Sequence, residues 1–291
     1  MTAPRRPADR SRLLATSAGR VYAVDRGPLE GPVPPLVLLH GLLVTHHAFR
    51  AILEPLATGT PQHPGRRVIA LDLPGGGESD RPEPSEADGY SLSWLAERVD
   101  EALGALGVGH CDLLGHSFGG AVALQLASTV PARVRRLVLV DPVAFTMELP
   151  LEGKMALVPR LGPLLFTQLY RRADLRRYLV RAFSTPELLD ERAVDVYWDR
   201  LGRDGGREAG YAMLLQMTRM DALRERLPKV NAPALVVWGD RDGLVPVENG
   251  ERLVELLPHA ELAVVEGCGH AVAEERPDAL LELVRGHLGP G

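Results

Sequence analysis

Long apolar runs are missing from this sequence of 291 residues. No stretch of about 18 consecutive apolar residues occurs, which is the length that a membrane-spanning helix needs. The N-terminus is rich in Pro and Arg and has no apolar segment of the kind that secretory signals carry. We therefore expect no membrane-spanning segment, no membrane partner and a cytoplasmic location.

Cysteine is scarce, since only Cys111 and Cys268 are present. They form neither a C-x-x-C motif nor a metal-ligand group, so the sequence predicts two free thiols and no zinc site. Positive charge is also in short supply, because 33 Lys and Arg stand against 38 Asp and Glu and give a net charge of −5. Nucleic-acid-binding proteins usually present a basic face, so we expect no nucleic-acid partner.

The sequence does contain short apolar runs that alternate with amphipathic stretches, and 45% of its residues are hydrophobic. This alternation is typical of a parallel sheet with crossover helices. It predicts an α/β fold with a mostly parallel central sheet and flanking helices, opened by an antiparallel hairpin at 12–27. The expected buried strands are 35–40, 66–72, 111–116, 135–141, 233–240 and 260–267, and the expected helices are 46–57, 92–107, 118–129, 247–257 and 271–287.

The alternation stops between residues 143 and 227, where helical patterns occur without a convincing strand. We interpret this segment as a helical cap inserted into a core formed by residues 12–142 and 228–291. Residues 1–11 are expected to be a disordered tail. The cap carries apolar side chains that are candidates either for a substrate pocket or for packing between its helices: Met155, Leu164, Leu165, Phe166, Tyr170, Tyr178, Phe183, Met213 and Met217.

A Gly-x-Ser-x-Gly motif places Ser117 between Gly115 and Gly119. A chain of this composition contains such a motif by chance roughly one time in ten, so its context decides. Here the motif follows a predicted strand and precedes a predicted helix, which is the strand–turn–helix context of a nucleophilic serine. Such a serine needs a base and an acid that orients the base, and His270 and Asp242 each follow a later predicted strand.

Two other carboxylates compete with Asp242 for the role of the acid. Asp240 lies two residues earlier and is expected to support the turn. Asp141 ends the strand after the motif helix and is expected to cap that strand and open the insertion.

Other polar residues near these strand ends have structural interpretations. His116 and Cys268 are expected to be packing residues, and His40 is expected to end a buried strand. His46 and His47 are expected to form a solvated first helical turn, because no carboxylate cluster accompanies them to indicate a metal site.

Taken in order, these motifs resemble the α/β-hydrolase superfamily, in particular its lid-bearing serine esterase-like members. The resemblance covers nearly all of residues 12–288. It rests on five ordered matches: His40-Gly41-Leu42, Asp72-Leu73-Pro74-Gly75-Gly76-Gly77-Glu78-Ser79, the motif around Ser117, Gly239-x-x-Asp242 and Gly269-His270.

The resemblance implies that Ser117 is the nucleophile, His270 the general base and Asp242 the acid, with the backbone N–H groups of Leu42 and Phe118 as the oxyanion hole. The chemistry expected from it is hydrolysis of a carboxylic ester or related acyl group through an acyl-enzyme, without a cofactor or metal. The substrate is expected to be a small, apolar acyl compound.

Several alternatives stay open at this point. The same three residues could serve a C–C bond hydrolase, a thioesterase, a lactonase or a perhydrolase, or the scaffold could be a non-catalytic small-molecule sensor. Dehalogenase and epoxide hydrolase chemistry are disfavoured, because an aspartate occupies the position of Ser117 in those relatives. The substrate and the oligomeric state are not specified by the sequence.

Overall fold

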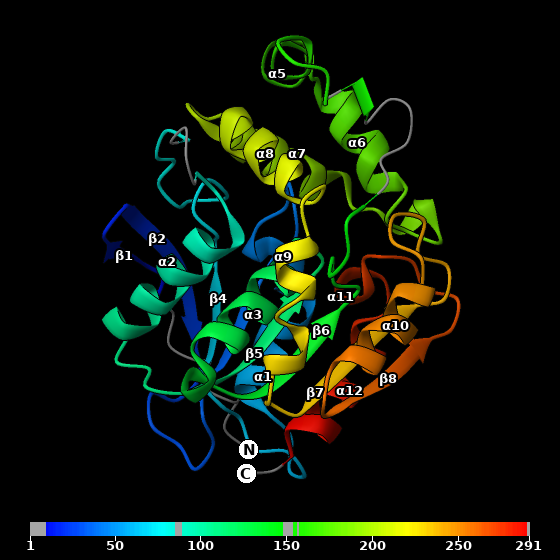
Figure 1. The fold of residues 1–291 in the computed structure, drawn as a ribbon. Coiled ribbons are helices and arrows are strands. Elements are labelled where there is room, and N and C mark those ends of the chain that lie inside the picture. The colour runs from blue at the N-terminus through cyan, green and yellow to red at the C-terminus, as the bar shows by residue number, and fades with distance from the viewer. Residues whose placement is uncertain (1–9, 85–88, 148–153, 156, 290–291) are drawn as a thin grey trace.

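An eight-stranded sheet runs through the centre of the molecule (Figure 1). The computed structural model describes residues 10–84, 89–147, 154–155 and 157–289. Only β1 and β2 and the pair β2 and β4 are antiparallel, so the predicted α/β fold with its opening hairpin is confirmed. The strands, in their order across the sheet, are β1 (Arg12–Thr16), β2 (Gly19–Arg26), β4 (Val68–Leu71), β3 (Leu36–Leu39), β5 (Cys111–His116), β6 (Val134–Val140), β7 (Ala234–Gly239) and β8 (Ala260–Val265).

Helices cover both faces of this sheet (Figure 1). Along β3, Val37 and Leu39 pack into the apolar cluster of one face, whereas Leu36 and Leu38 pack into that of the other. Because every residue of β3 is buried, the strand is continuously apolar, as expected for a sheet covered on both sides. One face carries α2 (Leu92–Ala105), α3 (Phe118–Thr129) and α10 (Glu248–Leu256), and the other carries α1 (Arg50–Thr58) and α12 (Pro277–Leu288).

The prediction of one final helix at 271–287 is wrong, because the segment contains two helices. α11 (Val272–Glu275) ends before Arg276, whose backbone lies outside the helical region at φ −134° and ψ 55°. Pro277 then occupies the first position of α12. A proline disfavours helical geometry in the residue before it and removes one N–H donor, which explains the break.

The segment between β6 and β7 holds no strand within its described residues, 143–147, 154–155 and 157–233. Most of its helices lie above the carboxyl ends of the strands in Figure 1. They are α5 (Leu161–Leu164), which continues as the π-helical turn η3 (Leu165–Leu169), then α6 (Arg172–Val180), α7 (Glu191–Leu201) and α8 (Gly206–Gln216). The last helix of the segment, α9 (Asp221–Arg224), lies beside α3.

A narrow neck joins the insertion to the sheet. The N–H of Met147 donates to the carbonyl of Met217 at 3.1 Å, and the N–H of Met220 donates to the Thr146 hydroxyl at 3.2 Å. Beyond the neck, Leu223 packs into the same apolar cluster as α3. The chain therefore leaves the sheet and returns to it at nearly the same place.

The predicted tail is described only in part, because residues 1–9 lie outside the described residues. Arg10 is held against β2, where its guanidinium pairs with the buried Asp25 at 2.9 Å. Among the helices of the described residues, none has the length and apolar character needed to cross a bilayer.

Candidate active site

Ser117 occupies a sharp turn between β5 and α3. Its backbone lies at φ 54° and ψ −119°, a left-handed region that residues other than glycine rarely adopt. Its N–H donates to the carbonyl of Val140 at 2.9 Å, and its carbonyl accepts the N–H of Val143 at 3.1 Å. A conformation of this kind costs about 1–3 kcal/mol and persists only where the surroundings hold it, which is typical of functional sites.

The two glycines of the motif are required by close backbone contacts. A Cβ atom on Gly115 would lie 2.5 Å from the carbonyl oxygen of Gly119. A Cβ atom on Gly119 would lie 2.3 Å from the carbonyl oxygen of Leu39, on the neighbouring strand β3. Helix α3 therefore begins so close to the sheet that no side chain fits at these two positions. As a result, the turn that carries Ser117 lies at the carboxyl edge of the sheet.

His270 and Asp242 meet beside this turn. His270 follows β8 and Asp242 follows β7, and the Nδ1 atom of His270 lies 2.6 Å from Oδ2 of Asp242. The other carboxylate oxygen of Asp242 accepts the N–H groups of Leu244 and Val245, at 2.7 and 2.9 Å. Since the carboxylate only accepts, Nδ1 of His270 carries a proton, and Nε2 can act as an acceptor whenever it carries none.

The carboxyl of Asp242 is kept ionised by its partners. Burial alone would raise its pKa, but the positive charge and hydrogen bond of His270, together with the two backbone N–H groups, outweigh burial and lower the pKa.

His116 links His270 to the serine turn. Its ring nitrogen Nε2 lies 2.9 Å from the carbonyl oxygen of His270, and the two ring centroids are 5.0 Å apart. Burial, and then the charge of His270, lower the pKa of His116 to about 3, so this ring is neutral. A packing residue is expected here from the sequence, and the structure adds this hydrogen bond to the His270 backbone. The Ser117 hydroxyl makes no direct hydrogen bond to His270 in the structure. His116 connects the two residues, because it precedes Ser117 in the chain and its ring is hydrogen-bonded to the His270 carbonyl.

The two competing aspartates have other partners. Asp240 accepts the N–H of Cys268 at 3.2 Å and so supports the turn, as expected. Asp141 accepts the N–H of Gly239 at 2.9 Å, and its second oxygen is buried without a hydrogen-bond partner among the described residues. Burial, reinforced by the negative charge of Asp242, raises the pKa of Asp141 well above its ordinary value. Among the three carboxylates, Asp242 is therefore the one that hydrogen-bonds His270.

One cluster of potential metal ligands coincides with this site. Ligand atoms of His116, Asp141 and His270 lie within 4.8 Å of one another. However, Nδ1 of His270 is bonded to Asp242 and Nε2 of His116 is bonded to a backbone carbonyl. The donor set therefore fits a His–Asp pair better than a metal centre.

The predicted oxyanion donors flank Ser117. In the described part of the chain, the backbone N–H groups of Leu42 and Phe118 donate to no other group. A Cβ atom on Gly41 would lie 3.1 Å from Cβ of Ser117, so the loop after β3 passes directly against the serine. Its neighbour His40 is fixed in one tautomer, because Nε2 accepts the N–H of Leu73 at 3.0 Å and Nδ1 donates to the Gly41 carbonyl at 2.8 Å.

Asp72 organises the loop beside the site, a role that the sequence analysis did not assign. Its buried carboxylate accepts the backbone N–H groups of His46 and Glu78, at 2.7 and 2.9 Å, and lies 2.9 Å from Nδ1 of the His46 ring. Burial would raise the pKa of Asp72, but the hydrogen bond and charge of His46 outweigh it and lower the pKa. The expectation of a solvated His46 is therefore wrong, because the ring is hydrogen-bonded to a buried acid.

Glu275 joins the His270 loop to the insertion, a role that the sequence analysis also did not assign. Its buried carboxylate accepts the N–H of Gly269 at 2.8 Å, and from the insertion it accepts the N–H groups of Ser184 and Thr185, both at 3.1 Å. The Ser184 hydroxyl also donates to it. A Cβ atom on Gly269 would lie 2.5 Å from the carbonyl of Ala182, so this contact is close. Nothing in the local sequence indicates that residues 91 positions apart would meet.

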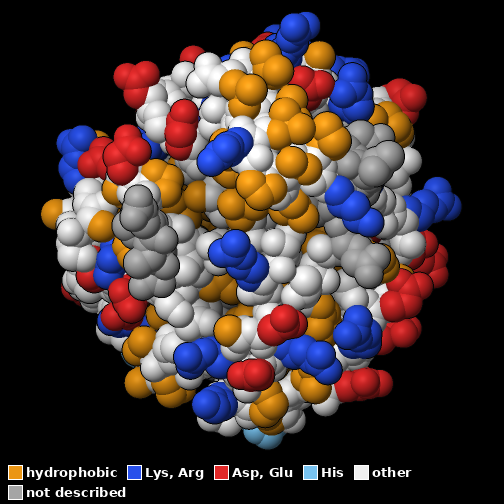
Figure 2. All heavy atoms as spheres, turned by 45° about the horizontal axis from the view of Figure 1, so that its top comes forward, with side chains coloured by type: hydrophobic (Ala, Val, Ile, Leu, Met, Phe, Trp, Pro, Cys, Tyr) orange, Lys and Arg blue, Asp and Glu red, His pale blue; other side chains and the backbone are white. Residues whose placement is uncertain are grey.

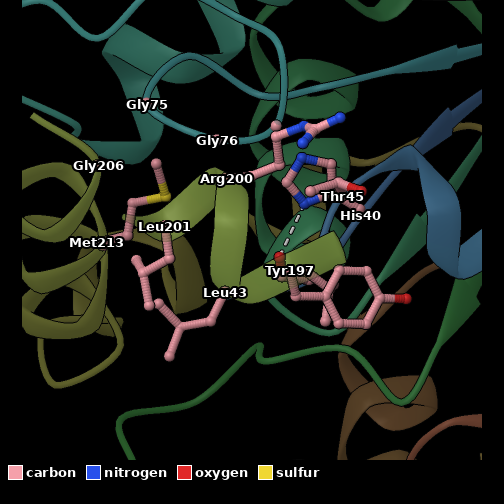
Figure 3. Close-up of a pocket in the computed structure, with 14 residues that line it drawn as sticks. His40, Leu43, Thr45, Gly75, Gly76, Tyr197, Arg200, Leu201, Gly206 and Met213 are labelled. Atoms are coloured by element: carbon pink, nitrogen blue, oxygen red, sulfur yellow. Dashed lines mark hydrogen bonds between the residues drawn. The ribbon is translucent and has the colours of Figure 1, made fainter. Parts of the chain in front are cut away.

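A small cavity lies between the loop after β3 and helices α7 and α8 (Figure 3). Its volume is about 20 Å³, and Leu43 projects toward Leu201 and Met213 of the insertion. Of the apolar side chains predicted for a pocket, Met213 lines this cavity. Phe166 instead stacks on Tyr170, with ring centroids 4.8 Å apart, and so packs between helices.

Comparisons with known proteins agree with this geometry. A family model described as the alpha/beta hydrolase fold matches residues 34–277. The chain is 32% identical over 231 residues to the 2-hydroxymuconate semialdehyde hydrolase of Pseudomonas putida, covering 77% of each chain. It is also 32% identical over 267 residues to the pimeloyl-(acyl-carrier protein) methyl ester esterase of Aeromonas salmonicida, covering 89% of this chain and 97% of that protein.

Among solved structures, Cfl2 from Burkholderia cenocepacia superposes with a TM-score of 0.84 at 26% identity. The alignment covers 99% of this chain and 98% of that chain. The similarity therefore includes the insertion as well as the sheet.

Proposed function

This chain belongs to the α/β-hydrolase fold family, and from that premise we propose that it is a serine hydrolase that cleaves a carboxylic ester through an acyl-enzyme. The observation that carries this proposal is the buried pair of His270 and Asp242, 2.6 Å apart, beside the strained turn of Ser117. The esterase relative adds support from ester chemistry on a similar chain.

In the first half of the reaction, the Ser117 hydroxyl attacks the ester carbonyl and transfers its proton to Nε2 of His270. Asp242 holds the ring with Nδ1 protonated and stabilises the imidazolium that forms. The negative charge that develops on the carbonyl oxygen is accepted by the N–H groups of Leu42 and Phe118. His270 then returns its proton to the departing alkoxide, which leaves as an alcohol.

In the second half, water attacks the acyl-enzyme and His270 accepts one of its protons. Collapse of the second intermediate expels Ser117, which recovers its proton from His270, and releases the carboxylic acid. Each step uses groups of this chain alone, so we propose that no cofactor takes part.

The insertion is proposed to act as a cap that admits the acyl group. A cavity of about 20 Å³ holds roughly one water molecule, whereas sites for small organic ligands span about 300–1,000 Å³. Entry of an acyl chain at this cavity would therefore require α7 and α8 to move away from the loop after β3.

A fluorophosphonate probe tests the proposed nucleophile. Attack at phosphorus uses the same serine, base and oxyanion donors as attack at a carbonyl, so labelling should map to Ser117 and disappear in Ser117→Ala. p-Nitrophenyl esters of graded acyl length should then show turnover and identify the preferred chain. Ligand binding without labelling or turnover would instead favour the non-catalytic sensor.

A C–C bond hydrolase is the second candidate, because the semialdehyde hydrolase of Pseudomonas putida is as similar in identity as the esterase. A 2-hydroxy-6-oxo dienoate, assayed beside the esters, separates the two. A kcat/KM for the dienoate that exceeds that of the best ester by about 100-fold or more would assign the protein to C–C bond cleavage.

A further inference from the structure

The outer face of the insertion exposes an unusual number of large apolar side chains. In the described residues, ten large apolar side chains are exposed, and six of them fall within residues 155–169. Their exposed fractions run from 36% to 54%. Figure 2 shows apolar side chains gathered on this face, with Lys and Arg among and around them. The six are Met155, Leu157, Val158, Leu161, Leu164 and Leu169.

This segment is amphipathic, and its buried side chains hold it against the rest of the insertion. Phe166 is buried and stacks on Tyr170, and its ring centroid lies 5.7 Å from that of Tyr211 in α8. Gly162 is also buried. These contacts fix the segment on the insertion while the six exposed side chains face away from it. Contiguous exposed apolar surface of this kind on a folded protein usually marks a contact site.

The charge of the same region is opposite in sign to that of the whole chain. Residues 154–183 contain seven Lys and Arg and one Asp, whereas the chain carries a net charge of −5. Some of these cations are paired, since Arg172 and Arg176 both contact Glu191. The side-chain charges of Lys154, Arg160 and Arg171 contact no carboxylate within the described part of the chain, although the backbone N–H of Arg171 donates to Asp174 at 3.0 Å.

We propose that this outer face, residues 154–155 and 157–171, binds the surface of an anionic lipid bilayer. The exposed leucines would enter the boundary between headgroups and acyl chains, and Lys154, Arg160 and Arg171 would contact lipid phosphates. A second copy of the chain fits less well, because a symmetric pair would bring these unpaired cations toward one another. The protein lies on the bilayer and does not cross it, consistent with the absence of a spanning helix among the described residues.

This inference departs from the sequence expectation of no membrane partner. That expectation rested on the absence of a long apolar run, which detects helices that span a bilayer. Exposed leucines on short helical turns form no long apolar run. Which of them are exposed depends on how Phe166 and its neighbours pack in the folded chain.

Flotation with lipid vesicles tests the proposal on the full chain. Binding should be strong to phosphatidylcholine vesicles that contain about a quarter phosphatidylglycerol, weak to phosphatidylcholine alone, and reduced by high salt. The double variant Leu164→Ser and Leu169→Ser should bind at least about 10-fold more weakly. Leu29→Ser is the matched control, because Leu29 is 57% exposed and lies in the loop after β2.

A second pair of variants separates the charge from the apolar contact. Arg160→Gln with Arg171→Gln should weaken binding to the anionic vesicles by about 5-fold for each charge removed, while Arg12→Gln on β1 should leave it unchanged. Ser117→Ala should bind like the wild type, so vesicle binding is tested separately from hydrolysis.

Two outcomes would overturn the proposal. One is a folded protein that fails to float with anionic vesicles, or that floats equally well after the leucine substitutions. The other is a concentration-dependent dimer in sedimentation that Leu164→Ser converts to a monomer, which would assign the face to a second copy of the chain.

Discussion

The carboxylate of Glu275 accepts the backbone N–H of Gly269 at 2.8 Å, one residue before His270. The same carboxylate binds two residues of the insertion, Ser184 and Thr185. One buried side chain therefore fixes both the loop that carries the proposed base and the segment that follows α6.

Replacing Glu275 with Gln should reduce both stability and activity. The amide cannot accept four hydrogen bonds and turns its NH₂ group toward N–H donors, so the free energy of unfolding should fall by about 2–4 kcal/mol. A displaced His270 loop should lower kcat by roughly 10- to 100-fold at temperatures where the variant is fully folded. Glu282→Gln, an exposed substitution in α12, is the control. A variant that is less stable but keeps wild-type kcat would show that Glu275 acts on the fold alone.

Two substitutions of Ser117 should separate chemistry from backbone strain. Ser117→Ala and Ser117→Gly should each lower kcat by about 10³-fold or more, since both remove the nucleophile. Only Ser117→Gly should relieve the strain of φ 54°, because glycine adopts this backbone conformation without cost. Glycine also makes the unfolded chain more flexible, which offsets part of this gain, so the free energy of unfolding should rise by about 1 kcal/mol in total. Urea unfolding of the two variants measures the difference. Equal stabilities would contradict a strained turn, and near-normal turnover in either would exclude Ser117 as the nucleophile.

The three neighbouring aspartates should rank clearly in activity. Asp242→Asn replaces the acceptor of the His270 Nδ1 proton and should lower kcat by up to about 10⁴-fold. Asp240→Asn and Asp141→Asn should each cost less than about 10-fold, because these side chains bind backbone N–H groups. Steady-state kinetics with one ester measures this ranking of kcat. A larger loss in Asp141→Asn than in Asp242→Asn would move the acid to the end of β6.

Asp141 should make stability decrease as pH rises. Its pKa is raised in the folded protein, so between about pH 4 and that raised value the unfolded chain has lost the proton that the folded chain retains. In this window the wild type loses up to about 1.4 kcal/mol of stability per pH unit relative to Asp141→Asn, which has no proton to lose. The groups that face Asp141, namely His116, Asp242, Glu275 and His270, are common to both proteins and largely cancel. Urea unfolding from pH 4 to 9 measures the gap, and a constant gap would refute a raised pKa.

Two apolar residues of the insertion should respond differently to truncation. Met213 lines the cavity beside the loop after β3, so Met213→Ala should shift the preferred acyl chain toward longer esters with little loss of stability. Phe166 stacks on Tyr170, so Phe166→Ala should lower the free energy of unfolding by about 3–5 kcal/mol and leave the acyl preference unchanged. The p-nitrophenyl ester series measures the acyl preference, and urea unfolding measures the stability. The opposite pattern would place the acyl site beneath η3.

Much of the fold was predictable because the sheet is buried on both faces. Continuous apolar runs such as 36–39 mark such strands, and the hairpin at 12–27 turns just before Gly19, whose φ is 102°. The break between α11 and α12 was visible in the sequence as Pro277, and it was missed because the apolar spacing continues through it.

The candidate site was predictable only where the chemistry lies in local motifs. Ser117, Asp242 and His270 each follow a strand, so their positions along the chain indicate one shared sheet edge. Glu275 and Asp72 gave no such signal, because their roles come from backbone N–H groups supplied by distant segments. The exposure of Leu164 and the burial of Phe166 likewise depend on packing that no local pattern encodes.

The neck at Met147 and Met217 makes the insertion a separately exchangeable part. The chain leaves and returns at one hydrogen bond of 3.1 Å, and among the described strands none lies between these two residues, so exchange of residues 148–216 keeps the strand order of the sheet. The exchange also removes Ser184 and Thr185, which share the carboxylate of Glu275 with the His270 loop. A grafted insertion is therefore expected to change which molecules reach the site, and to preserve the reaction only where it again supplies N–H donors to Glu275.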